Sequence, residues 1–449
     1  MSFAAEAAAF RAAHPDIDTL EVFIIDLNGM ARGKIAPIQH LDKLAAGGMK
    51  MPVSSYALDI YSIDTAEAKL SIETGDPDGV LIPVPGSLRR VPWGNRQVAQ
   101  VQAQITQVDG VSPCPFDPRT VLASVANEAA QRGLTTVMAL ELEFFLIDPT
   151  DPCPAREPGT GKRLENPQIY VMDVLRPFAE IMEEIATAAR ALGAPAETVI
   201  TEFGPGQFEM NLGHVADPVA AADQMVALKR AIRGVARHHG LDATFMAKPY
   251  GTQYGSGLHL HMSLLDQDGS SVFSSEEGVC PAARHAVAGL LTTMADFMLV
   301  FAPHSNSYRR LAPGSFAPVV AAWGLDNRGT SVRMPETSGP GARIEHRTSG
   351  ADANPYLVAA AVLAGALQGL DDEREPPKPI AREARPGDGP DLPLSWWAAE
   401  RRLTESEIVA RWFGTEFRRV FSAQKRQERA ALLAEVPPSE YSVYLRALA

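Results

Sequence analysis

Charged side chains recur two positions apart in three stretches that otherwise have the composition of buried β-strands. The stretches are 138–147 (MALELEFFLI), 255–264 (GSGLHLHMSL) and 342–349 (ARIEHRTS). Residues i and i+2 of a strand lie on one face, so Glu141 and Glu143 are expected to point to one side and their apolar neighbours to the other. Carboxylates gathered in a half-buried cavity need cations that neutralise them. The spacing therefore predicts a metal site.

Further candidate ligands lie in the other two stretches and in segment 201–213 (TEFGPGQFEMNLG). Gln207 and Glu209 share a strand face, and Glu202 precedes a Gly-Pro-Gly turn expected to fold it toward the same cavity. The predicted ligands are Glu141, Glu143, Glu202, Glu209, His259 and Glu345. Any one of these glutamates alone would more often be a solvated or salt-bridged side chain, so only the ensemble indicates a site. This set suits about two or three hard divalent cations, Mg²⁺ or Mn²⁺, better than a tetrahedral Zn²⁺.

Arginine side chains form a second group in the last third of the chain. They are Arg309, Arg310, Arg328, Arg333, Arg343 and Arg347. The planar guanidinium binds carboxylate and phosphate with two hydrogen bonds, although a surface ion pair is an equal alternative for any single one. Divalent cations facing arginines across a cavity are the usual apparatus of phosphoryl transfer. The chain has no GxxxxGK[ST] motif and no GxGxxG after a strand, so a nucleotide must bind by another route.

The elements that position these groups are expected to belong to an α+β fold. Segment 19–38 predicts two strands joined by a turn at Asn28-Gly29. Segment 116–134 predicts a helix capped by Asp117 and followed by Gly133. We place a domain boundary near 105–115, which gives an N-terminal domain of residues 1–110 and a catalytic domain of residues 111–449.

Composition limits the classes of partner. The net charge of −13 argues against a nucleic-acid partner, because no basic face is available to match phosphates. The three cysteines are few and far apart, which fits a reducing compartment. Segments 286–303 and 357–370 are expected to be buried helices rather than membrane spans, and the alanine-rich start of the chain a short helix rather than a secretory signal. We therefore expect a cytoplasmic protein with no membrane partner.

The chain resembles a known family, the glutamine synthetases and their amine-ligating relatives. The matching segments run in the family's order from about residue 20 to residue 370. They are VFIIDLNGMARGK, GDPDGVLIPVPGSLRRVPW, ALELEFFL, GPGQFEMNLGH, MAKPYGTQYGSGLHLHMSL, NSYRRLAPGSFAP, WGLDNRGTSVRMP and RIEHRTSGADANPYLVAA. The resemblance implies a small β-grasp-like N-terminal domain and a large catalytic domain on a curved antiparallel sheet with flanking helices. It also implies a homo-oligomer, a dodecamer of two hexameric rings, with active sites between neighbouring subunits.

The resemblance implies an activity as well. Family members make γ-glutamyl phosphate from glutamate and ATP, and an amine then attacks it to give an amide, ADP and phosphate. It implies that the metal on the glutamate side is bound by Glu143, Glu202 and Glu209. It implies that the metal on the nucleotide side is bound by Glu141, His259 and Glu345.

Other roles follow from the same resemblance. Glutamate is expected to contact Arg310, Arg347 and the backbone at Gly255. The transferred phosphoryl group is expected to be neutralised by the catalytic residues Arg328 and Arg333. Nucleotide-phosphate contacts are expected from His261 and Arg343.

The chain departs from the ammonia-using members at three positions. Pro52, in MPVSS, stands where they carry an Asp that binds ammonium, and Phe316, in PGSFAP, stands where they carry a Glu on the flap over the site. Tyr254 replaces an Asn that contacts glutamate. Loss of both acids removes the groups that desolvate and deprotonate ammonium, and the apolar replacements suit the carbon chain of an alkyl amine.

This combination is similar to the γ-glutamylpolyamine and γ-glutamylmonoamine synthetases, which are glutamate–amine ligases. We expect an ATP-dependent ligase that joins glutamate to a polyamine or monoamine. The alternatives are a glutamine synthetase that uses ammonia, a non-catalytic structural or sensing homologue that keeps the fold, and a ligase acting on another carboxylic acid.

Overall fold

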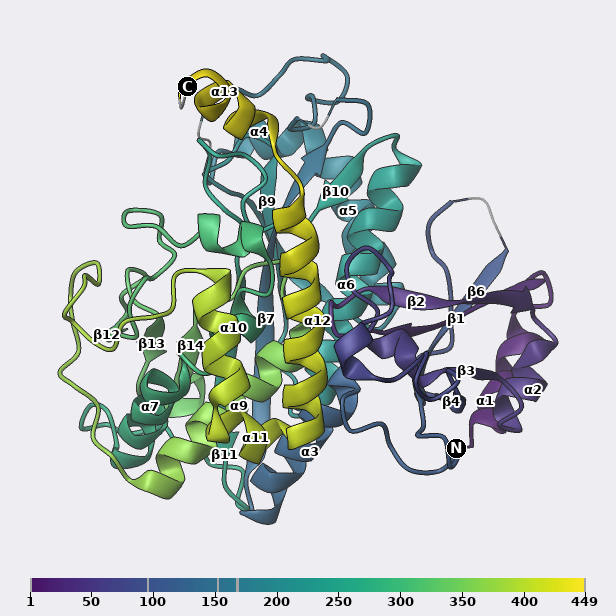
Figure 1. Ribbon diagram of the computed structural model, residues 1–449, viewed down its shortest axis with the longest axis horizontal. Coiled ribbons are helices and arrows are strands. Elements are labelled where there is room, and N and C mark those ends of the chain that lie inside the picture. Colours follow the sequence, from purple (N-terminus) through teal and green to yellow (C-terminus); the bar gives the residue numbers. More distant parts are fainter. Residues whose placement is uncertain (1, 95–96, 152, 167–168, 448–449) are drawn as a thin grey trace.

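The computed structural model describes residues 2–94, 97–151, 153–166 and 169–447. Its strands form two separate sheets, a six-stranded sheet near the N-terminus and an eight-stranded sheet in the remainder of the chain. Figure 1 shows the N-terminal sheet (purple) beside the larger body, where the long helix α12 (Thr415–Ala434, yellow) packs against the helices α10 (Trp396–Glu405) and α11 (Glu407–Phe413). The mixture of helices with mainly antiparallel strands is the expected α+β class.

The N-terminal sheet has the strand order β2-β1-β6-β4-β3, and β5 pairs with β6. Its β1–β6 pair is parallel and its other pairs are antiparallel. The elements of this part are α1 (Phe3–Ala13), β1 (Thr19–Ile25), β2 (Ala31–Pro37), α2 (His40–Ala45), β3 (Lys50–Pro52), β4 (Asp78–Pro83), β5 (Arg89–Arg90) and β6 (Val98–Ile105).

The large sheet has the strand order β12-β13-β14-β11-β7-β9-β8, and β10 also pairs with β7. Its pairs are antiparallel except β12–β13, which is parallel. The strands are β7 (Thr135–Ile147), β8 (Ala196–Thr201), β9 (Gln207–Leu212), β10 (Asp242–Thr244), β11 (Leu258–Leu265), β12 (Trp323–Leu325), β13 (Val332–Glu336) and β14 (Arg343–His346). The helices are α3 (Pro118–Gln131), α4 (Met172–Leu175), α5 (Ala179–Ala191), α6 (Pro218–His238), α7 (Pro281–Thr293), α8 (Met298–Phe301), α9 (Pro355–Asp372), α10 (Trp396–Glu405), α11 (Glu407–Phe413), α12 (Thr415–Ala434) and α13 (Pro438–Ala447).

Local signals in the sequence explain several of these elements. β1 and β2 form the expected antiparallel hairpin, and Gly29 in its turn has the positive φ of 75° that glycine tolerates best. The helix expected over 116–134 is α3, and the Asp117 side chain accepts a hydrogen bond from the backbone N–H of Arg119. The predicted hairpin and helix are thus confirmed.

The core of the larger part is built on helix α9, which is buried along most of its length as expected. Helix α7 approaches it so closely that a Cβ on Gly289 would lie 2.1 Å from the carbonyl oxygen of Gly365. Only a residue without a side chain allows this backbone approach. Within the described residues, no helix is both long and apolar enough to cross a membrane.

The N-terminal hairpin forms hydrogen bonds with helix α12, near the end of the chain. In its turn, the Asn28 amide donates to Glu428 Oε1 at 2.7 Å, and Lys425 Nζ lies 3.0 Å from Glu428 Oε2. Both charged side chains are fully buried, so removal of one partner would leave the other charge unpaired. Strand β6 ends at residue 105 and α3 begins at residue 118, on either side of the predicted boundary. The division into domains of residues 1–110 and 111–449 stays a prediction.

Candidate active site

The register of three neighbouring strands brings the predicted acidic residues together. Glu143 on β7 lies directly opposite Glu209 on β9. Glu141, two residues earlier on β7, lies opposite His259 on β11. Because opposed residues of an antiparallel pair have their Cβ atoms about 5 Å apart, these side chains share one face of the sheet.

The same face continues onto β14 and β13. Glu345 on β14 lies opposite His261 on β11 and opposite Arg333 on β13. The row of charged residues that the sequence predicted on 342–349 therefore adjoins the rows on β7 and β11.

Three groups of potential metal-binding atoms result, each with its atoms within 4.8 Å of one another. The groups are Glu141, Glu209 and His259; Glu141, His261 and Glu345; and Glu143, Glu202 and Glu209. The last group is the set expected for the metal on the glutamate side. Oxygen-rich donor sets with one or no imidazole fit hard divalent cations such as Mg²⁺ or Mn²⁺.

The structure places the two histidines in other groups of potential metal ligands than the sequence predicted. His261 Nε2 lies 3.0 Å from Glu141 Oε1 and belongs to the group that contains Glu345. His259 lies between Glu141 and Glu143, at 3.5 Å and 3.8 Å from their carboxylate oxygens. Both imidazoles thus face the acids, although only His259 was predicted as a ligand.

Burial and mutual repulsion act on the carboxylates of the third group. Desolvation, together with the negative charge of Glu143, raises the pKa of Glu202 to about 8. Desolvation and the charges of Glu141 and Glu143 raise the pKa of Glu209 well above its ordinary value. A divalent cation between these carboxylates would remove this penalty and keep them ionised.

The acids on the other side of the cluster are held ionised by cationic neighbours. Burial pushes the pKa of Glu345 upward, but the charge of Arg347 and those of the two histidines outweigh it and lower the pKa to about 2. Burial likewise opposes ionisation of Glu141, yet hydrogen bonds from His259 and His261 hold its pKa far below the ordinary value.

Two buried arginines, Arg310 and Arg347, lie next to the acidic residues. Arg310 and Arg347 are 5% and 6% exposed. Arg310 donates to the carbonyl oxygens of Thr348 at 2.9 Å and Arg347 at 3.3 Å, and Arg347 Nη1 lies 2.5 Å from Glu345 Oε1. Among the described residues the buried Nε of Arg347 has no hydrogen-bond partner.

Arg333 and Arg328, the two predicted catalytic residues, are placed differently. Arg333 bridges Glu345 Oε2 at 2.7 Å and Asp326 Oδ1 at 2.5 Å. Arg328 is exposed in the turn between β12 and β13, where its positive charge adds to the hydrogen bond from Arg333 in lowering the pKa of Asp326. Arg343 Nε donates to Nδ1 of His261 at 3.2 Å, so these two predicted nucleotide contacts adjoin each other.

Gly255 lies where a side chain would not fit. A Cβ at this position would come within 2.4 Å of the Ala247 carbonyl oxygen and 2.8 Å of Arg310 Cγ. The Gly255 carbonyl accepts a hydrogen bond from Gln207 Nε2 at 3.0 Å, and the same amide reaches Glu143 Oε2 at 3.4 Å. The glycine therefore allows the loop to approach Arg310 closely.

Sequence reasoning assigned no role to two residues that position others. Gln207 was noted only as sharing a strand face with Glu209, and its amide links the loop at Gly255 to Glu143. Asp326, in the turn after β12, orients Arg333, and no local pattern in the sequence marks it.

The two residues predicted to form the amine pocket lie in different parts of the chain. Phe316 belongs to a short hairpin, residues 312–317, which we call the flap. Pro52 lies at the end of β3, where it pairs with Asp78 in the N-terminal sheet. Their placement in one pocket is an expectation that involves a second subunit.

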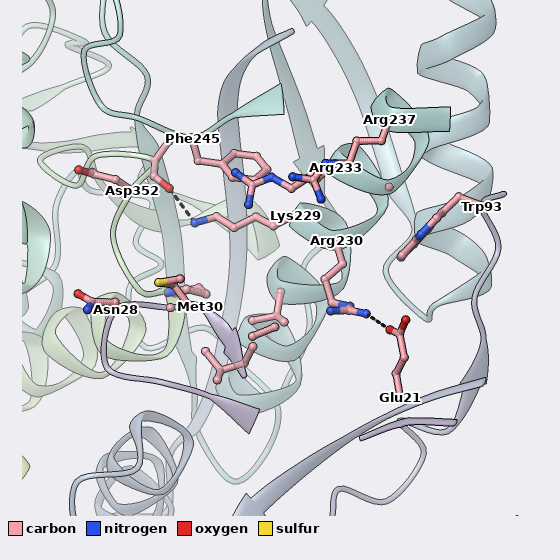
Figure 2. Close-up of a pocket in the computed structure, with 17 residues that line it drawn as sticks. Glu21, Asn28, Met30, Trp93, Lys229, Arg230, Arg233, Arg237, Phe245 and Asp352 are labelled. Atoms are coloured by element: carbon pink, nitrogen blue, oxygen red, sulfur yellow. Dashed lines mark hydrogen bonds and ion pairs between the residues drawn. The ribbon is translucent and has the colours of Figure 1, made fainter. Parts of the chain in front are cut away.

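A separate cavity of about 620 Å³ lies between the N-terminal sheet and helix α6. Figure 2 shows Lys229, Arg230 and Arg233 of α6 pointing into it. Lys229 donates to two backbone carbonyls and Arg230 is paired with Glu21, so these cations already have partners. The cavity contains none of the predicted metal ligands, and the acid clusters define the candidate site instead.

Comparisons with known proteins agree with this site. The family model described as "Glutamine synthetase, catalytic domain" matches residues 115–444. The chain is 37% identical to gamma-glutamylputrescine synthetase PuuA of Escherichia coli K12, over 95% of this chain and 91% of that protein. It is 33% identical to a glutamate–isopropylamine ligase of a Pseudomonas species, over 90% and 89%. The solved "GmaS/ADP complex-Conformation 1" is similar with a TM-score of 0.85 and 29% identity, over 98% of this chain and 99% of that one.

The match of the catalytic-domain model covers well over half of the chain, and the sheet that it spans carries the acid and arginine rows in the register described above. The protein belongs to the glutamine synthetase family.

Proposed function

We propose that this protein is an ATP-dependent ligase that joins the γ-carboxylate of glutamate to an organic amine, a polyamine or a monoamine. The reaction passes through γ-glutamyl phosphate and yields a γ-glutamyl amide, ADP and phosphate. The observation that carries the proposal is the adjoining acid groups that share Glu141 and Glu209 and face the guanidinium groups of Arg333 and Arg347. The amine ligases among the similar proteins support the choice of acceptor.

Two to three Mg²⁺ or Mn²⁺ ions are proposed cofactors, with ATP as co-substrate. Glu143, Glu202 and Glu209 would hold the ion on the glutamate side, and Glu141, Glu345 and a histidine the ion on the nucleotide side. When bound, the ions neutralise phosphate oxygens and polarise the carboxylate that is phosphorylated.

The protein's own groups would orient the reactants. We assign glutamate to Arg310, Arg347 and the backbone at Gly255, because both guanidinium groups are buried and fixed by hydrogen bonds. Arg343 and His261 adjoin each other and are assigned to the nucleotide phosphates.

Arg333 would neutralise the charge that develops on the phosphoryl group during transfer. Its bonds to Asp326 and Glu345 fix its direction before the substrate arrives, which favours electrostatic stabilisation of the transition state. Arg328, exposed in the turn between β12 and β13, is assigned the same role beside Arg333.

The acceptor pocket is assigned to Phe316 of the flap and to Pro52 of a second subunit. Both are uncharged where ammonia-using members carry acids, so a bare ammonium ion would lose the groups that bind and deprotonate it. This assignment requires a homo-oligomer, and we propose the dodecamer of two hexameric rings in the cytoplasm. The three cysteines, which form no disulfide among the described residues, suit a reducing compartment.

A phosphate-release assay over a panel of amines tests the proposal. Glutamate, ATP and Mg²⁺ are held constant while putrescine, spermidine, ethanolamine, methylamine and ammonium are compared. We expect at least one organic amine to exceed ammonium in kcat/KM, with the γ-glutamyl amide identified by mass. Ammonium as the best acceptor would make the protein a glutamine synthetase, and no turnover with any acceptor would indicate a non-catalytic homologue.

A further inference from the structure

Three aromatic rings form a continuous stack beside the acid groups. The ring centroids of Tyr254 and Phe203 are 4.5 Å apart with an interplanar angle of 24°. Those of Phe203 and Phe316 are 6.0 Å apart with an angle of 17°. We call these three rings the aromatic stack. It joins the loop before β11, the loop after β8 and the flap, which are far apart in the sequence.

The loops that carry the stack also carry predicted site residues. Phe203 directly follows Glu202, and its backbone N–H donates to Glu202 Oε2 at 3.2 Å. Tyr254 directly precedes Gly255, whose carbonyl is bound by Gln207. The stack therefore lies at the edge of the acid groups, and the same backbone segments position the rings and the carboxylates.

Phe316 keeps an unfavourable conformation at the outer end of the stack. Its φ of 55° lies in the left-handed region, which bulky residues avoid, and its side chain is 48% exposed. Stacking on Phe203 offsets part of this cost. Residues with strained backbone cluster at active sites and ligand clamps, which makes Phe316 a candidate for a ligand contact.

Two of the three departures from the ammonia-using pattern meet in this stack. Tyr254 and Phe316 replace polar residues of ammonia-using members, and Phe203 contacts both rings. Aromatic faces pack against methylene groups and attract cationic ammonium groups. A carbon chain would gain both contacts, whereas ammonia has no chain to place there.

We infer that the aromatic stack selects the acceptor amine by its carbon chain, with Phe203 and Tyr254 as specificity-determining residues beside Phe316. This inference rests on the proposed function and deepens it. The attacking nitrogen points toward the acid groups, and the chain lies along the rings. Amines with several carbons therefore gain more from the stack than methylamine does.

Substitution of the central ring tests the inference. Phe203→Leu keeps an apolar side chain and removes the aromatic face. We expect kcat/KM for butylamine and putrescine to fall about tenfold, the value for methylamine to fall less than about twofold, and the KM for glutamate to stay unchanged. Phe203→Tyr keeps the ring and is expected to recover the preference for longer amines.

Two further variants separate selectivity from stability. Tyr254→Leu alters the partly exposed inner end of the stack and should shift the amine preference in the same direction, which decides the matter if Phe203→Leu fails to fold. Trp397→Leu removes a 53% exposed aromatic residue on α10 and serves as the matched control, with no change in amine preference expected.

The outcomes distinguish this inference from the proposed function. A wild-type protein that forms no γ-glutamyl amide would overturn both. A wild-type protein that ligates amines, with Phe203→Leu and Tyr254→Leu slowing every amine equally or changing only the KM for glutamate, would overturn the role of the stack alone.

Discussion

Glu143 and Glu209 lie directly opposite each other on β7 and β9, with Glu202 completing a group of three carboxylates. Like charges opposed across an antiparallel pair destabilise a sheet. A fold that places them there needs either protons or cations to offset the repulsion. Desolvation by burial, together with this repulsion, raises the pKa of Glu202 and of Glu209, and a bound divalent cation would offset both effects at neutral pH.

Neutralising one of the opposed acids should weaken metal binding and remove turnover. We expect Glu209→Gln to abolish phosphate release with every amine. Because an ion that binds only the folded protein raises its melting temperature, Mg²⁺ should raise the melting temperature of Glu209→Gln less than that of the wild type. Thermal melts with and without Mg²⁺ check this. An undiminished Mg²⁺ shift in the variant would contradict the ligand assignment.

Metal should flatten the dependence of the free energy of unfolding on pH. In the metal-free protein the pKa of Glu202 is raised to about 8, so the folded state holds a proton that the unfolded state releases near pH 4.5. The free energy of unfolding should therefore fall as pH rises from about 5 to about 8, by up to about 1.4 kcal/mol per pH unit for one such group. Urea titrations in EDTA measure it.

Two comparisons isolate this effect from other titrating groups. Mg²⁺ should flatten the slope, because the bound ion keeps the carboxylates ionised in the folded state. Glu202→Gln should make the slope shallower without metal, because one of the groups with a raised pKa is gone while Glu209 still contributes. Equal slopes for wild type and variant in EDTA would show that Glu202 does not carry the repulsion.

Removal of Arg333 should affect turnover far more than substrate affinity. Its partner charge develops during phosphoryl transfer, so Arg333→Ala should lower kcat by about 10²–10³ while the KM for glutamate changes little. Glu345 would still be paired with Arg347 in this variant, which limits the damage to the fold. Steady-state kinetics at saturating ATP test the split.

A variant of Asp326 tests how the ion pair with this residue orients Arg333. Asp326→Asn removes a charged acceptor of the guanidinium and should lower kcat by about tenfold, less than loss of the arginine itself. A rise in the KM for glutamate without a fall in kcat would assign Arg333 to substrate binding instead.

A side chain at Gly255 should weaken glutamate binding. The Cβ of Gly255→Ala would collide with the Ala247 carbonyl and with Arg310, and the displaced loop would move the guanidinium assigned to glutamate. We expect the KM for glutamate to rise about tenfold or more. Gly251→Ala is the matched control, because its Cβ would meet no atom within 4 Å. Equal KM values for both variants would refute the assignment.

Much of the site could be predicted from residue spacing alone. Alternation along β7 and β11 fixes which side chains of one strand share a face, so Glu141 could be grouped with Glu143, and His259 with His261, without coordinates. The hairpin at Gly29 and the helix capped by Asp117 follow from equally local rules.

What the sequence could not supply was the pairing between distant strands. The register that sets Glu143 against Glu209 and His261 against Glu345 depends on tertiary packing. For the same reason the contact of Phe203 with Tyr254 was not foreseen, since the two residues lie in loops with no periodicity. The local sequence also does not predict that Arg328 is exposed in the turn between β12 and β13.

A direct competition between acceptors tests the central claim of the account. The protein is supplied with glutamate, ATP, Mg²⁺ and equal concentrations of ammonium and putrescine or another organic amine, and the amide products are quantified by mass spectrometry. The account predicts that a γ-glutamyl amide of an organic amine predominates over glutamine. Predominance of glutamine across the amine panel, or the absence of any amide, would contradict it.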